Sequence, residues 1–217
     1  IKDLATVIQN DAGGIGLFRS EFIYLEKDRY PTEEEQFSIY KTAVETMAGK
    51  RVIIRTLDIG GDKEIPYMGL EKDENPFLGY RAIRLCLDRK EDIYKPQLRA
   101  LLRASAYGNI RIMIPLVTCI DELREAKALI EEIKAELDEK NIAYKKDIQV
   151  GIMVETAAAS LLPHLTAPES GCVQDFNRYY NYGLIPSLNR NVFRHPVQEQ
   201  LCNSAFIRKT NGRGKVL

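Results

Sequence analysis

Three charged residues follow short apolar runs that are rich in β-branched side chains: Arg19, Arg55 and Glu155. A guanidinium is a planar fork that binds phosphate or carboxylate through paired hydrogen bonds, and a carboxylate binds a divalent cation. Two arginines and one glutamate at one place would suit a small, highly anionic substrate held with a metal ion. Phosphoryl transfer needs such a site, because its transition state spreads negative charge over the phosphate oxygens.

The segment 52–63, Val-Ile-Ile-Arg-Thr-Leu-Asp-Ile-Gly-Gly-Asp-Lys, is the centre of this pattern. Its apolar start indicates a buried strand that delivers Arg55 and Asp58 at its C-terminal end. Gly60 and Gly61 would let the backbone approach a ligand closely. The alternative is an ordinary strand followed by a glycine turn with solvated charges, and the segment alone does not separate the two.

Apolar runs and helical stripes alternate along the first 160 residues. Strands are expected at 15–18, 52–55, 110–117 and 148–154, and helices at 3–9, 80–87, 95–107 and 120–140, with a further helix that begins with a capping box from Thr32 to Glu35. Such alternation predicts an α/β fold of parallel βα units. Because the C-terminal ends of parallel strands share one rim, Arg19, Arg55 and Glu155 should gather there.

The composition excludes several classes of function. Of the 217 residues 45 % are hydrophobic, and 31 basic residues balance 31 acidic ones, so no net charge favours nucleic acid or an anionic membrane surface. No apolar run reaches the length of a membrane span and the start lacks the features of a signal peptide, so a cytoplasmic location is expected. The missing initiator methionine indicates a piece of something longer.

The cysteines and histidines carry no recognisable site. Cys86, Cys119, Cys172 and Cys202 are widely spaced and form no CxxC pair, so incidental thiols are expected rather than a zinc site. No chemical role is predicted for the two histidines either, since isolated histidines are usually surface or satisfied core residues. No residue is therefore assigned as catalytic.

Five segments, in order and at similar spacing, resemble enzyme I of the bacterial phosphotransferase system, the phosphoenolpyruvate–protein phosphotransferases. They are Gly-Ile-Gly-Leu-Phe-Arg-Ser-Glu-Phe at 14–22, Pro-Thr-Glu-Glu-Glu-Gln-Phe at 31–37, the run at 54–63, Asn-Pro-Phe-Leu-Gly-Tyr-Arg-Ala-Ile-Arg at 75–84 and Gly-Ile-Met-Val-Glu-Thr at 151–156. The resemblance covers about residues 1–160.

The resemblance implies a partial (β/α)8 TIM barrel over 1–160, with about four βα units that match strands two to five of the family barrel. In that family the barrel binds phosphoenolpyruvate and Mg2+ and forms a homodimer, and the phosphoryl group passes to a histidine on a separate N-terminal domain and then to HPr. Carried over by position, Arg19 and Arg55 match arginines that bind the substrate phosphate, Arg81 matches a further active-site arginine, and Glu155 matches one magnesium-ligating carboxylate.

The pattern is lost after residue 160. Residues 161–217 show neither a helical stripe nor strand alternation, and they lack the family's Gly-Thr-Asn-Asp metal segment and its Gly-Met-Cys-Gly cysteine context. Some codons for Phe-Asn-Arg-Tyr at 176–179, when translated in a reading frame shifted by one nucleotide, encode Ser-Ile-Gly-Thr. In the family these residues lead into the metal segment. We interpret 161–217 as a non-family tail, frameshifted or disordered; a genuinely divergent tail is the alternative.

Two kinds of function therefore stay open. The chain is either the phosphoenolpyruvate-binding part of enzyme I, which starts sugar uptake, or a catalytically inactive truncated fragment. Within the first class, another phosphoenolpyruvate-utilising enzyme such as pyruvate phosphate dikinase or phosphoenolpyruvate synthase is the alternative. In either case we expect the chain alone to be inactive in turnover, because it carries one predicted metal carboxylate and no phosphohistidine context.

Overall fold

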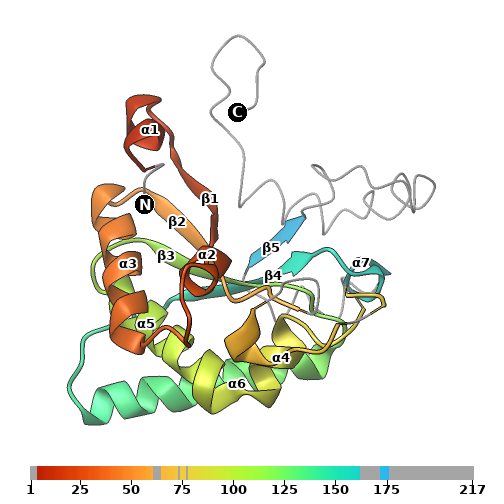
Figure 1. The fold of residues 1–217 in the computed structure, drawn as a ribbon. Helices are drawn as coiled ribbons and strands as arrows, with labels where there is room; N and C mark the ends of the chain where they lie inside the picture. Colours follow the sequence, from red (N-terminus) through yellow and green to blue (C-terminus); the bar gives the residue numbers. More distant parts are fainter. Residues whose placement is uncertain (1–3, 61–64, 73, 77, 162–171, 176–217) are drawn as a thin grey trace.

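A parallel β-sheet organises the chain in the computed structural model, which describes residues 4–60, 65–72, 74–76, 78–161 and 172–175 (Figure 1). Its five strands are β1 Gly14–Arg19, β2 Arg51–Arg55, β3 Ile110–Ile114, β4 Gln149–Val154 and β5 Cys172–Asp175. The strands lie side by side in chain order, and each pairs in parallel with the next. This arrangement confirms the predicted α/β class and is consistent with a partial barrel.

Helices connect the strands. They are α1 Leu4–Gln9, α2 Glu21–Leu25, α3 Glu33–Thr46, α4 Ile83–Asp88, α5 Lys95–Ser105, α6 Ile120–Glu139 and α7 Ala157–Leu161, with a 3-10 turn at Pro66–Met68 and a π-helical turn at Lys90–Tyr94 that runs into α5. Helix α5 packs between α3 and α6, and the three lie together on one side of the sheet in Figure 1.

The two faces of the sheet carry different side chains, because neighbouring residues of a strand point to opposite faces. Ile54, Ile112 and Ile152 belong to the main hydrophobic core, which includes the buried residues of the helices. Ile53, Met113 and Met153 form a second cluster, with Leu17 packed against it. Arg55 and Glu155 each follow a member of this second cluster by two positions, so their side chains start from the face away from the helices.

The predicted capping box at the start of α3 is confirmed. Glu35 N donates to Thr32 Oγ1 at 3.3 Å, and Thr32 N donates to Glu35 Oε2 at 2.8 Å. Hydrogen bonds from Arg29 and then Lys27 hold the pKa of Glu35 well below its usual value. Local sequence alone therefore fixes where this helix begins.

Several sequence-based boundaries need correction. The strand expected at 110–117 ends at Ile114. The helix expected at 80–87 begins only at Ile83, because Ala82 has a φ of +51°, which is incompatible with a helix. No strand was predicted after residue 160, yet Cys172–Asp175 pairs in parallel with β4. Cys-Val-Gln-Asp is neither a continuous apolar run nor a strict alternation of apolar and polar residues, so its sequence gives no strand signal. The rest of the predicted tail, 162–171 and 176–217, lies outside the described residues, so its interpretation stays a prediction.

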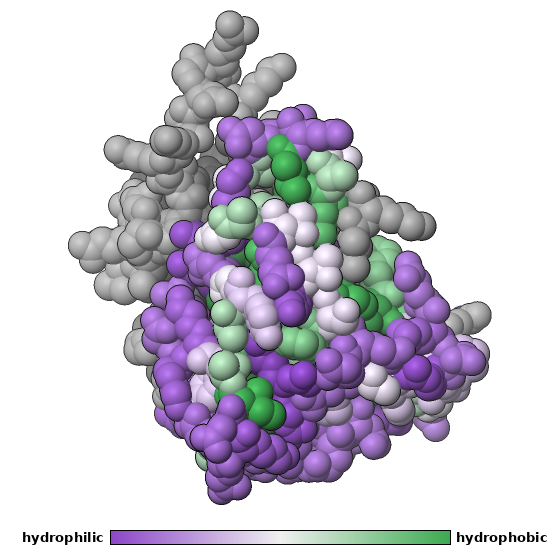
Figure 2. Space-filling model, turned by 90° about the vertical axis from the view of Figure 1, so that its left-hand side faces the viewer, coloured by the Kyte–Doolittle hydropathy of each residue, from purple (hydrophilic) through white to green (hydrophobic). Residues whose placement is uncertain are grey.

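The surface is mostly hydrophilic on the side shown in Figure 2, where hydrophobic residues occur in small groups. Among the described residues, no helix combines the length and the apolar composition that crossing a membrane requires.

Candidate functional site

Buried ion pairs join Arg55, Asp58 and Arg81 just beyond the C-terminal end of β2. Arg55 Nη1 donates to Asp58 Oδ2 at 2.9 Å, and Arg81 Nε donates to Asp58 Oδ1 at 2.9 Å. Arg55 Nη2 also pairs with Glu21. The four side chains are only 1–9 % exposed. Such burial is costly for charges unless they are paired, so these carboxylates hold the two guanidinium groups in place.

Each member of this network comes from a chain segment near a strand end. Glu21 opens α2 directly after β1, and Arg55 is the last residue of β2. Arg81 lies next to Gly60, where an added Cβ would meet the Arg81 Cβ at 2.5 Å. Only glycine allows this close approach. The positive φ of Ala82 lies directly after Arg81, so backbone strain accompanies the placement of this arginine.

Glu155 follows the C-terminal end of β4 and accepts a hydrogen bond from Leu116 N at 2.8 Å. Leu116 has a φ of +53°, a strained conformation that points its amide at the carboxylate. Burial, and next the charge of Asp58, raise the pKa of Glu155 to about 7; the Leu116 hydrogen bond, Arg55 and Arg81 act in the opposite direction. The protonation of Glu155 therefore depends on the charges of the arginine network.

Arg19 lies beside Arg55 in the register of β1 and β2, but its side chain is exposed. Its guanidinium carbon is 5.4 Å from the centre of the Phe22 ring, a cation–π contact. Of the residues predicted for the site, the structure brings Arg55, Arg81 and Glu155 together, whereas Arg19 is their neighbour through the backbone only.

Sequence reasoning passed over Glu21, which supplies a carboxylate to Arg55 from 34 positions away. Its position two residues after Arg19, at a strand end, was the available indication. Asp58 was noticed as a charge after a strand, but its role as a bridge between two arginines depends on tertiary contacts. Its pairing with Arg81 spans 23 positions.

The fit of a divalent cation can be judged from the acidic groups present. Glu155 is a buried carboxyl group that follows a strand end, and its oxygens suit one ligand position of a divalent cation. Within the described residues, however, no three histidine, cysteine, aspartate or glutamate side chains converge as a metal cluster. The described residues thus offer one ligand and not a complete cation site.

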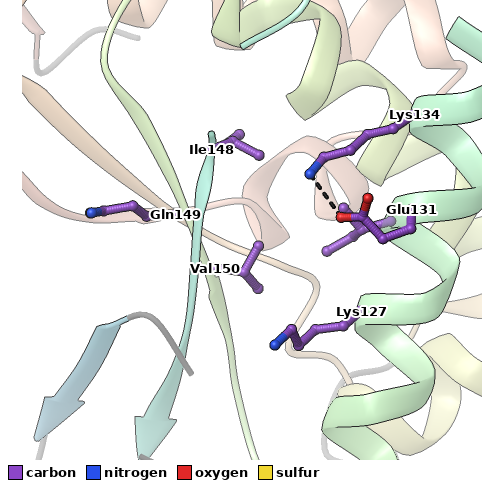
Figure 3. Close-up of a pocket in the computed structure, with 7 residues that line it drawn as sticks. Lys127, Glu131, Lys134, Ile148, Gln149 and Val150 are labelled. Atoms are coloured by element: carbon purple, nitrogen blue, oxygen red, sulfur yellow. Dashed lines mark hydrogen bonds and ion pairs between the residues drawn. The ribbon is translucent and has the colours of Figure 1, made fainter. Parts of the chain in front are cut away.

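A pocket of about 250 Å3 lies elsewhere, between α6 and the beginning of β4 (Figure 3). Its lining residues are Lys127, Ile130, Glu131, Lys134, Ile148, Gln149 and Val150. Lys134 Nζ donates to Glu131 Oε1 at 2.8 Å and to the Lys146 carbonyl at 3.2 Å. The pocket is at the opposite end of β4 from Glu155, so it is separate from the arginine network.

The chain is similar to known proteins over most of its length. The family model described as "PEP-utilising enzyme, PEP-binding domain" matches residues 1–170. A protein of Staphylococcus carnosus strain TM300 is 57 % identical over 168 residues, which are 77 % of this chain and 29 % of that protein. Relatives from Priestia megaterium and Staphylococcus aureus are 52 % and 56 % identical over 168 residues, which again are 77 % of this chain and 29 % of each relative. All three are named phosphoenolpyruvate-protein phosphotransferase, and the chain spans less than a third of their length.

Proposed function

The chain belongs to the family of phosphoenolpyruvate-utilising enzymes, and we propose that it is the phosphoenolpyruvate-binding part of a phosphoenolpyruvate–protein phosphotransferase. The observation that supports this most is the identity of 52–57 % to proteins of that name over 167–168 residues. In this proposal the phosphoryl group passes to a histidine on another domain and then to HPr, which starts sugar uptake. The names of these relatives favour this enzyme over pyruvate phosphate dikinase.

The arginines would bind the substrate phosphate. Arg55 and Arg81 are held by carboxylates before any ligand arrives, so little side-chain entropy remains to be lost on binding. Arg19, with its exposed guanidinium, would meet the anion at the entrance. Glu155 would provide one ligand for Mg2+, an ion that offsets phosphate charge when bound.

The remaining expectations follow from the same proposal. We propose a cytoplasmic homodimer whose small-molecule partner is phosphoenolpyruvate and whose protein partner is HPr, reached through a separate phosphohistidine domain. Neither nucleic acid nor a membrane is proposed as a partner, since the net formal charge is zero.

Calorimetric titration of the full 217-residue chain with phosphoenolpyruvate and Mg2+ tests the proposal. We expect the parent chain to bind and Arg55→Ala to lose measurable binding. Arg103→Ala is the matched control, because Arg103 also forms paired contacts to carboxylates but lies on the outer surface of α5. Absence of binding by the parent, or equal binding by Arg55→Ala, would contradict the proposal.

The second candidate function is that of a catalytically inactive fragment, which binds phosphoenolpyruvate but does not transfer its phosphoryl group. The sequence favours it, because it carries one predicted metal carboxylate and no phosphohistidine context. We expect no release of pyruvate from phosphoenolpyruvate when this chain is mixed with HPr and Mg2+. Phosphorylation of HPr by the chain alone would overturn this candidate and leave the first one standing.

A further inference from the structure

Gln97 is a fully buried polar residue on α5, a helix whose other buried residues are mostly apolar. A buried amide costs free energy unless its hydrogen bonds are made, so a core position of this kind calls for a reason. We propose that Gln97 is a positioning residue for the phosphoenolpyruvate site, tying the segment after β1 to the segment after β2. The proposal rests on the proposed function for its ligand.

The Gln97 amide makes three hydrogen bonds to distant parts of the chain. Its Oε1 accepts from Leu57 N at 2.9 Å, and its Nε2 donates to Ser20 Oγ at 3.1 Å and to Tyr40 Oη at 3.2 Å. These partners are 40, 77 and 57 positions away. One side chain therefore joins both rim segments to α3.

Only one orientation of the amide satisfies these contacts. The Leu57 N–H can only donate, so Oε1 must face it and Nε2 must face the two hydroxyl groups. Burial raises the pKa of Tyr40, so its hydroxyl keeps its proton and donates it to Gln36 Oε1 at 3.2 Å. Tyr40 Oη is then left to accept from Gln97. The network has a fixed direction, which makes it a rigid connection.

The two anchored points lie among the charged residues of the candidate site. Ser20 is between Arg19 and Glu21, and Leu57 directly precedes Asp58. Ser20 opens α2 without a capping hydrogen bond from its side chain, so its hydroxyl is not needed for the helix. Gln97 would thus hold the Arg55 network in register from the core side, without touching a ligand.

Tyr24 offers a matched control for simple loss of core stability. Its hydroxyl donates to Gln36 Oε1 at 3.3 Å, so Tyr24→Phe removes a hydrogen bond from the same buried network. No hydrogen bond joins the Tyr24 hydroxyl to Ser20 or Leu57 among the contacts of the described residues. A purely structural role for the network predicts similar behaviour of Gln97→Met and Tyr24→Phe.

The test compares Gln97→Met, Ser20→Ala and Tyr24→Phe with the parent in the full chain. Calorimetric titration with phosphoenolpyruvate and Mg2+ should show affinity about tenfold weaker for Gln97→Met, since small misplacements of binding groups cost that much or more. Ser20→Ala should be weakened by about threefold, because one of the three hydrogen bonds is lost. Tyr24→Phe should bind like the parent.

Amide hydrogen exchange gives a readout that needs no ligand. In Gln97→Met, exchange at Leu57 and at residues 19–21 should accelerate about tenfold more than exchange in β3, whereas Tyr24→Phe should change all of them alike. Uniform acceleration in Gln97→Met, or equal affinity of Gln97→Met and the parent, would overturn the positioning role. If the parent itself does not bind phosphoenolpyruvate, the proposed function fails, and the exchange pattern still decides whether Gln97 holds the two segments. If Gln97→Met does not fold, Ser20→Ala takes its place in both measurements.

Discussion

Two arginine–carboxylate networks in this molecule use the same chemistry in different surroundings. At the strand ends, Arg55 and Arg81 pair with Glu21 and Asp58, and all four side chains are at most 9 % exposed. On the outer helices, Arg99 and Arg103 of α5 pair with glutamates of α3 and α6, and these side chains are 20–70 % exposed.

The two networks use the same pairing chemistry and differ in burial. Exposed pairs are screened by water and contribute little, whereas buried charges are costly and strongly dependent on their partners. A chain optimised for stability alone would place apolar side chains at the strand ends. Buried charges at the strand ends cost stability, and such costs are typical of positions that bind a ligand.

The largest expected effect comes from removing the bridge between the buried arginines. Asp58→Ala leaves Arg55 and Arg81 without a shared carboxylate in a dry environment, so we expect the free energy of unfolding to fall by about 3–5 kcal/mol. Urea unfolding of the whole chain measures it. Asp58→Asn, which keeps acceptor capacity, should lose less. A change below about 1 kcal/mol for Asp58→Ala would show that the buried network is no different from the exposed one.

The raised pKa of Glu155 predicts that the stability of the folded chain depends on pH. The unfolded chain releases this proton near its ordinary pKa of 4.5 and the folded chain only near about 7. Between these values the folded state binds more protons, so stability falls as the pH rises, by at most about 3 kcal/mol in total.

Urea unfolding across pH 4–8 of the parent and Glu155→Gln measures this difference. The variant should lack the decline between the two pKa values. An identical pH profile in the two proteins would mean that Glu155 is solvated and not part of the buried site.

Gly60→Ala tests how tightly Arg81 is packed. The new Cβ would meet the Arg81 Cβ at 2.5 Å, so we expect a loss of about 1–3 kcal/mol and weaker phosphoenolpyruvate binding. Gly13→Ala is the control, since nothing lies within 4 Å of a Cβ there. Thermal unfolding and calorimetric titration measure the two effects. Equal behaviour of both alanine variants would disprove the close packing at Gly60.

The smallest effect is expected in the outer network. Glu34→Gln removes the partner of Arg103 Nη2, whose carboxylate side chain is 70 % exposed, while Glu33 still pairs with Arg103 Nη1 at 2.6 Å. The free energy of unfolding should change by less than about 0.5 kcal/mol, and less still at high salt. A loss comparable to that of Asp58→Ala would erase the distinction between the two networks.

Features set by neighbouring residues were predictable from the sequence. The capping box from Thr32 to Glu35 depends on three positions, and the strands ending at Arg55 and just before Glu155 show as apolar runs. Strand ends in a parallel sheet share one rim, so the gathering of Arg55 and Glu155 also followed.

Features set by distant contacts were not predictable. The pairing of Glu21 with Arg55 and the three bonds of Gln97 join segments that only the folded sheet and helices bring together. Arg19 is exposed and its guanidinium carbon lies 5.4 Å from the centre of the Phe22 ring, and the strand pattern did not predict either feature. The fifth strand has neither an apolar run nor a strict alternation in its sequence.

The charges of the buried network cancel, because the two arginines Arg55 and Arg81 are matched by Glu21 and Asp58. A neutral cluster projects little field into solvent, so these four residues would add little to the steering of an anion from a distance. In the proposed site, the dependence of the association rate constant on ionic strength would then come from the exposed guanidinium of Arg19. Capture of the substrate would be decided at contact, by the geometry of the guanidinium groups.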